Sequence, residues 1–168
     1  MLIGHGWDLH QHSENKTLKL GGVNFDEQGF EGHSDGDILL HALCDALLGA
    51  TGKKDLGHYF PSNESTPKDI PSTDIFAEIL NVVEYEKFSL INLDITIVTQ
   101  KFNVQEKAVK IQNNLSKLLE VPVEKINIKG KSSDDYGIIG DQKASLAIVS
   151  LLLAVSYTHL TLPTKRIV

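Results

Sequence analysis

The chain of 168 residues is poor in sulfur and in long apolar runs, with one cysteine, one methionine and one tryptophan. A single cysteine, Cys44, cannot close a disulfide within the chain, so we expect a reducing compartment and place the protein in the cytoplasm. The longest apolar run, IVSLLLAV, is far shorter than the roughly 20 residues of a membrane-spanning helix. The beginning of the chain also has no apolar run of the signal-peptide type. We therefore expect neither a targeting nor a membrane segment.

Positive charge is also scarce, because 16 Lys and Arg residues oppose 22 Asp and Glu residues and give a formal net charge of −6. Proteins that bind a phosphate backbone carry a basic surface, so we expect no nucleic-acid partner. Hydrophobic residues at 41% and charged residues at 23% are ordinary values for a globular domain. A chain of this length buries one good core, and we predict a single domain over residues 1–156.

Residues 157–168, YTHLTLPTKRIV, break the pattern of the rest of the chain. They contain two basic residues and no acidic residue, and no apolar period of the preceding chain continues through them. We expect this segment to be a non-native tail of translated read-through sequence. The alternative is a native extension that packs on a partner. Without the tail, 14 basic residues oppose 22 acidic ones, and the net charge becomes −8.

Hydrophobic periodicity predicts strands that alternate with helices. Alternation of period two indicates strands over residues 1–10, 17–23, 89–98 and 125–131. Helical spacing indicates helices over residues 37–49, 72–86 and 104–119, and a final apolar helix that ends near Val155. Loops are expected over residues 26–37, which are rich in glycine, and 55–72, which contain three prolines. We predict an α/β or α+β fold in which helices cover one face of a mixed sheet.

The first predicted strand carries candidate metal ligands. Asp8 and His10 are two residues apart, so their side chains leave the same face and can reach one ion. His12 shares that face only if the strand continues. Two ligands make a weak site, because zinc sites use at least three protein ligands, and the alternative is a polar strand end. Trp7 lies on the opposite face, and we expect it to pack in the core.

The first predicted helix supplies a third candidate ligand. Asp37, His41 and Asp45 interrupt its apolar surface at spacings of four residues, which places them on one flank. His41 could complete a metal site, with Asp45 or a backbone carbonyl orienting its ring. The alternative is a helix, capped by Ser34 or Asp35, in which His41 is a hydrogen-bonded core residue.

These stretches together resemble the family of 2-C-methyl-D-erythritol 2,4-cyclodiphosphate synthases from Ile3 to about Ala154. The motifs that carry the resemblance are IGHGWDLH, the glycine pair of the second strand, HSDGDILLHALCDALLGA and DLGHYFP. The resemblance implies a lyase of non-mevalonate isoprenoid (terpenoid) biosynthesis. Such an enzyme converts 4-diphosphocytidyl-2-C-methyl-D-erythritol 2-phosphate into the cyclic diphosphate and releases CMP. It also implies a homotrimer whose active sites lie between neighbouring subunits.

The resemblance also implies roles for individual residues. Asp8, His10 and His41 fall on zinc ligands, and Asp134 falls on a Glu that binds Mg²⁺ or Mn²⁺. These metal ligands at positions 8, 10 and 134 would also contact the substrate. The other expected substrate contacts are His33 and Ser34 at the diphosphate, Asp55, Leu56 and Gly57 at the ribose, and Ser132 and Ser133 in the stretch SSDD. His33 and Ser132 are the expected catalytic residues.

Two other functions remain open at the level of sequence. One is a metal-dependent phosphoester hydrolase, which needs a general base to activate water, and the sequence presents no obvious base. The other is a non-catalytic zinc-dependent binder of a nucleotide or an isoprenoid diphosphate. Two loops favour the binder, because QKFNVQ stands where the family commonly has a Pro-Lys pair and GDQKA where it has Arg and Glu. The joint presence of the expected metal and phosphate residues argues against it.

Overall fold

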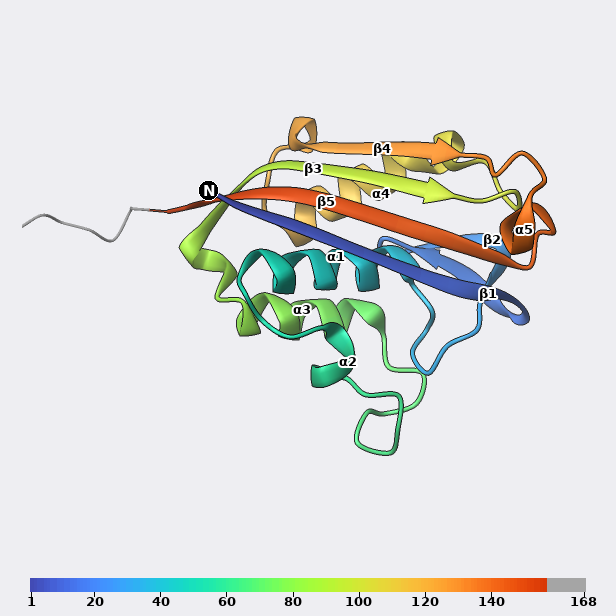
Figure 1. Cartoon of the computed structure of the whole chain (residues 1–168), viewed down its shortest axis with the longest axis horizontal. Coiled ribbons are helices and arrows are strands. Elements are labelled where there is room, and N and C mark those ends of the chain that lie inside the picture. The colour runs from blue at the N-terminus through green and yellow to red at the C-terminus, as the bar shows by residue number, and fades with distance from the viewer. Residues whose placement is uncertain (157–168) are drawn as a thin grey trace, which may run out of the picture.

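A computed structural model describes residues 1–156 as a five-stranded sheet with helices packed on one face (Figure 1). The strands are β1 Leu2–Leu20, β2 Val23–Phe30, β3 Phe88–Val98, β4 Ile126–Lys131 and β5 Ala144–Val155. The helical elements are α1 Ile38–Ala50, α2 Leu56–Tyr59, α3 Ser72–Val82, η1 Tyr85–Lys87, α4 Val104–Leu118, η2 Val123–Lys125 and α5 Gly137–Gly140. The proposed non-native tail lies outside the described residues. Among the helices that are described, none has the length and apolar character needed to cross a membrane.

The sheet is mixed, as the sequence predicts. Its strand order is β2-β1-β5-β3-β4, and only β3 and β4 run parallel. Helix α4 provides the crossover that a parallel pair requires. In Figure 1, α1 and α4 lie under the same side of the sheet, and α3 lies against α1 on the side away from the strands. The predicted α/β class, with helices on one face, is therefore confirmed.

Helix α1 packs with its backbone directly against β1. Gly4 and Gly6 face the helix, and a Cβ atom at either position would overlap a backbone carbonyl oxygen of Ala46 or Ala42. Nine apolar side chains and Cys44 are buried between Ile38 and Ala50, enclosed by the sheet and α3. This close approach places the middle of α1 beside the segment of β1 that carries Asp8 and His10.

The first two strands form a longer hairpin than the sequence predicts. The polar stretch QHSENK (residues 11–16) lies between the strands predicted at residues 1–10 and 17–23, where a turn was expected, and instead continues β1 as far as Leu20. The stretch DEQGF (residues 26–30), which we expected to begin a loop, belongs to β2 and pairs with β1. The connection is the two-residue turn Gly21–Gly22, where both residues have positive φ. The sequence pattern does not predict this pairing, because the polar, turn-forming residues of these edge strands are also frequent in loops.

The segment predicted as the last helix is instead the central strand β5. It pairs antiparallel with both β1 and β3. Ala147, Val149 and Leu151 are buried under α1, while Ile148 and Leu152 on the other face are also apolar and partly buried. A run that is apolar on both faces shows no period of two, and it is therefore indistinguishable from a buried helix by pattern alone.

No helix of the described chain covers the second face of the sheet. Trp7 is 61% exposed there and Ile3 is 79% exposed. The prediction that Trp7 packs in the core is wrong, because the glycine face of β1 turns toward α1 and leaves Trp7 on the outer face. The result is an apolar surface on a sheet whose other side forms the core.

Candidate metal centre and active site

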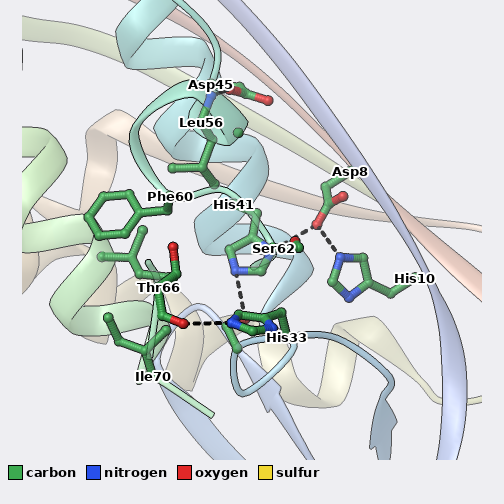
Figure 2. Close-up of a pocket in the computed structure, with 13 residues that line it drawn as sticks. Asp8, His10, His33, His41, Asp45, Leu56, Phe60, Ser62, Thr66 and Ile70 are labelled. Atoms are coloured by element: carbon green, nitrogen blue, oxygen red, sulfur yellow. Dashed lines mark hydrogen bonds and ion pairs between the residues drawn. The ribbon is translucent and has the colours of Figure 1, made fainter. Parts of the chain in front are cut away.

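A cavity of about 230 Å³ opens beside the start of α1 and contains most of the expected site residues (Figure 2). Its walls come from β1, the loop before α1, α1 itself, α2 with the loop that follows, and α3. The lining residues are Asp8, His10, His33, Ser34, His41, Asp45, Leu56, Gly57, Phe60, Ser62, Thr66, Ile70 and Ile75. Segments that are far apart in the sequence therefore meet in a single cavity with both polar and apolar walls.

Three of these side chains form a cluster with the composition of a metal site. In Figure 2, Asp8 and His10 from β1 turn toward His41 on α1. One ligand atom from each lies within 4.8 Å of the others. Asp8 Oδ2 is 3.0 Å from His10 Nε2 and 3.0 Å from His41 Nδ1. Two imidazole nitrogens and one carboxylate oxygen leave one position of a tetrahedral zinc site open, as catalytic zinc sites require.

The charges in the cluster favour a cation at its centre. Burial raises the pKa of Asp8, but hydrogen bonds from His10 and His41 outweigh burial and lower it to about 2. Burial lowers the pKa of His41, yet the Asp8 carboxylate raises it above its ordinary value. The carboxylate therefore stays ionised and favours positive charge on the His41 ring. His10 Nδ1 is also buried without a hydrogen-bond partner among the described residues. The donor set and its charges fit a divalent metal.

The far nitrogen of the His41 ring is held by two hydroxyl groups. Its Nε2 lies 3.1 Å from Ser34 Oγ and 3.1 Å from Ser72 Oγ. We expected Asp45 or a backbone carbonyl in this role, and that prediction is wrong. Asp45 Oδ1 instead accepts the amide hydrogen of Leu56 at 2.7 Å, which fixes the start of α2. The sequence has no signal for Ser72, because only folding brings the first residue of α3 to this ring.

Helix α1 is capped by Asp37 and not by Ser34 or Asp35. The Asp37 carboxylate accepts hydrogen bonds from two amides in the first turn of α1 and from both amides of the Gly21–Gly22 turn. Residue 36 is a glycine with φ 82, and this turn shifts the capping position beyond the two predicted residues. Asp37 thereby ties the β1–β2 hairpin to the helix that carries His41.

The expected phosphate and ribose residues lie along the same cavity. His33 Nε2 is 2.7 Å from the carbonyl oxygen of Thr66, so the ring donates a hydrogen bond that joins the loop before α1 to the loop after α2. Ser34 is 6% exposed. Leu56 and Gly57 line the cavity, and Asp55 stands next to them just before α2.

The remaining expected residues do not lie in this cavity. Ser132 lines a second cavity, of about 200 Å³, between the loop after β3 and the end of β4. Ser132 Oγ accepts the Asp134 amide hydrogen at 2.8 Å and lies 3.2 Å from its carboxylate, and Ser133 completes this short loop. The fold of one chain therefore brings the expected residues together in two separate groups, one around the first cavity and one in the short loop that begins with Ser132 at the second.

Comparisons with known proteins agree with this geometry. The model of the YgbB family matches residues 1–154. The 2-C-methyl-D-erythritol 2,4-cyclodiphosphate synthase of Fusobacterium nucleatum is 40% identical over 152 residues, which cover 90% of this chain and 95% of that protein. The structure of IspF from Plasmodium falciparum in a CDP complex has a TM-score of 0.80 and 32% identity, and the match covers 92% of this chain and 96% of that one. The bifunctional IspDF of Campylobacter jejuni has a TM-score of 0.86 and 31% identity, and this chain spans 42% of its length.

Proposed function

The chain belongs to the YgbB family, and on that premise we propose which of its residues carry out the family's reaction. Its function is to cyclise 4-diphosphocytidyl-2-C-methyl-D-erythritol 2-phosphate to 2-C-methyl-D-erythritol 2,4-cyclodiphosphate with release of CMP, in the non-mevalonate isoprenoid pathway. This is a lyase activity, and the substrate is a small cytidine nucleotide. The structural observation that supports this function best is the cluster of Asp8, His10 and His41 at the cavity.

We assign two metals to the site. Asp8, His10 and His41 would hold zinc, since two imidazoles and a carboxylate suit that ion. Asp134 would hold magnesium or manganese, because a carboxylate is a hard oxygen ligand. When bound, such ions polarise phosphate oxygens and neutralise the charge that develops on them. This assignment also explains how an acidic chain, with a net charge of −6, accepts a highly anionic substrate.

In the proposed mechanism the protein orients the substrate and supplies no nucleophile. An oxygen of the substrate's own 2-phosphate bonds to the β-phosphorus, and the bond from that phosphorus to the oxygen of CMP breaks, so CMP leaves with the electron pair. His33 and Ser34 would position the diphosphate, and Ser132 and Ser133 would stabilise charge in the transition state. Asp55, Leu56 and Gly57 would hold the ribose. Holding both reacting groups of one molecule in line removes most of the entropic barrier.

We propose that the active enzyme is a homotrimer with its sites between subunits. The cavity that holds His41 is separate from the one lined by Ser132, and a neighbouring copy could bring the second group to the first. The uncovered sheet face, with Trp7 and Ile3 exposed, supplies an apolar surface for such a contact. Burying it between copies would explain why apolar residues remain on both faces of β5.

The proposed partners are therefore the substrate and other copies of the chain. We propose no nucleic-acid partner, because a chain with a net charge of −6 is repelled overall by a phosphate backbone. We also propose a cytoplasmic location, which is supported by the buried free thiol of Cys44.

Phosphorus NMR of the purified protein with zinc, magnesium and the diphosphocytidyl substrate tests the function. We expect CMP and a cyclic diphosphate to appear together. CMP with an open-chain phosphate product would instead identify a hydrolase. Absence of turnover, with metals bound and the oligomer intact, would identify a non-catalytic binder and contradict the proposal.

A further inference from the structure

A chain of polar side chains leads from the surface to the back of the His41 ring. Lys19 on β1 donates from Nζ to Asp35 Oδ2 at 3.0 Å. Ser72 Oγ donates to the other oxygen of Asp35 at 2.5 Å. Ser72 Oγ also lies 3.1 Å from His41 Nε2. The residues come from β1, the loop before α1, α3 and α1, so four separate segments meet behind one proposed metal ligand.

The direction of these hydrogen bonds determines where the His41 ring carries its proton. A serine hydroxyl has one hydrogen, and the hydroxyl of Ser72 gives it to Asp35, which as a carboxylate can only accept. Ser72 Oγ can therefore only accept from His41, so the contact between them is a hydrogen bond only when Nε2 carries a hydrogen. Ser34 Oγ, at 3.1 Å from the same nitrogen, is a second oxygen available to that hydrogen. The nitrogen that faces Asp8, Nδ1, is left to share a proton with the carboxylate or to give its lone pair to a metal.

Lys19 and burial keep this direction from reversing. The side chain of Asp35 is 12% exposed, and Ser72 is 1% exposed, so water does not compete freely for their hydrogen bonds. Burial raises the pKa of Asp35, but the hydrogen bonds from Ser72 and Lys19 lower it below its ordinary value. The carboxylate thus remains an acceptor. If it were absent, the Ser72 hydroxyl could rotate and donate to Nε2, and Nδ1 could then be protonated against Asp8.

We propose that Asp35 and Ser72, supported by Lys19, are positioning residues that fix His41 as the Nε2–H tautomer and so present Nδ1 to a divalent metal. The inference rests on the proposed metal centre and adds residues that do not themselves touch the metal. Partners that hold a ligating histidine from behind commonly contribute 10- to 100-fold to metal affinity, so loss of either acceptor should weaken binding by roughly that factor.

The test measures zinc binding to the full chain without substrate. Metal-free protein is titrated with Zn²⁺ against a chromophoric chelator for the wild type, Asp35→Ala and Ser72→Ala. We expect the dissociation constant to rise roughly 10- to 100-fold in both variants. Ser72→Thr keeps the hydroxyl and should retain most of the affinity. Glu84→Gln is the matched control, because it removes a carboxylate that pairs with Lys87 on the surface and should leave zinc affinity unchanged.

A second measurement reads the tautomer directly. Nitrogen-15 NMR of histidine-labelled, metal-free wild type, at a pH where the ring is neutral, should show His41 protonated at Nε2, because in that state no metal imposes the tautomer and only the hydrogen bonds select it. The proposal is overturned if His41 carries its proton at Nδ1, or if Asp35→Ala and Ser72→Ala bind Zn²⁺ as tightly as the wild type. If Ser72→Ala fails to fold, Asp35→Ala and the wild-type spectrum still decide. Turnover is not measured, so failure here is distinct from failure of the synthase function.

Discussion

At the scale of single residues, His41 connects most of the site. One ring nitrogen faces Asp8 at 3.0 Å and the other faces two serine hydroxyls at 3.1 Å each. It lies on a helix whose neighbouring side chains are buried, so the ring has little freedom to turn away. The two other proposed ligands, Asp8 and His10, both lie on β1, and His41 supplies the third ligand that a metal site needs.

Replacing His41 by alanine should abolish both zinc binding and turnover. Asp8 and His10 would remain, but two ligands do not form a stable zinc site. Metal analysis of the purified variant after dialysis measures the zinc content, and phosphorus NMR measures turnover. His5→Ala is the control, because His5 lies on the opposite face of β1 and should leave zinc content unchanged. Full zinc occupancy in His41→Ala would refute the ligand assignment.

Asp35 should also make stability depend on pH in the acidic range. Its pKa is lowered in the folded chain, so its contribution is fully present above the unfolded value of about 3.9 and is lost as pH falls through the lower folded value. Asp35→Asn should therefore reduce the free energy of unfolding by on the order of 1 kcal/mol near neutral pH, and by less near pH 3. Urea denaturation in the presence of a chelator measures both. An equal difference at the two pH values would contradict this linkage.

At the scale of elements, the contact between β1 and α1 places the metal ligands. Glycines at positions 4 and 6 allow the helix backbone to approach the strand. This approach brings His41 beside Asp8 and His10, which follow Gly6 on the same face of the strand. Gly49, near the end of α1, has no close neighbour of this kind, because a Cβ added there would have its nearest contact at 3.8 Å. The pair of sites offers a direct test of the packing.

Gly6→Ala should destabilise the fold by roughly 3 kcal/mol or more, because the added methyl group meets helix backbone that no side-chain rotation can move. Gly49→Ala should be neutral or stabilise by roughly 0.5–1 kcal/mol, since alanine favours a helix and the position is exposed. The free energy of unfolding in urea compares them. Similar stabilities for the two variants would show that β1 and α1 are not in direct backbone contact.

At the scale of the whole molecule, the two groups of site residues lie in different places, and the helices of the described chain leave one face of the sheet uncovered. The first group surrounds the start of α1, and the second lies in the loop after β4. Apolar side chains such as Trp7 remain exposed on the face that α1 and α4 do not cover. Association through that face would bury it and could join the two groups across a subunit boundary.

Mixed oligomers test this arrangement. His41→Ala and Asp134→Ala should each be inactive alone, while Asp134→Ala keeps its zinc. Co-expressed in equal amounts, they should recover activity, because in a ring of three about a quarter of the sites would pair an intact His41 with an intact Asp134 of the neighbour. Turnover of the mixture is compared with each variant alone. If one subunit forms the whole site, every site lacks a residue and the mixture stays inactive.

Local features of this protein follow from its sequence alone. Period-two spacing placed Asp8 and His10 on one face of a strand, and helical spacing placed His41 on an apolar helix, because such patterns depend only on neighbours along the chain. The helices at residues 72 and 104 began where predicted, and the motifs around HSDGD identified the family. Most of the residues expected at the metal and the diphosphate do meet in one cavity.

Features that depend on partners distant in the sequence follow only from the folded arrangement. β5 is a strand because β1 and β3 hydrogen-bond to both of its sides, although its apolar run also suits a helix. Trp7 is exposed because α1 packs closely against the other face of β1, where two glycines leave room for it. Ser72 reaches the His41 ring across 31 positions of chain, a contact that no local pattern encodes. These outcomes follow from long-range packing and hydrogen bonding, which become defined only when the segments meet.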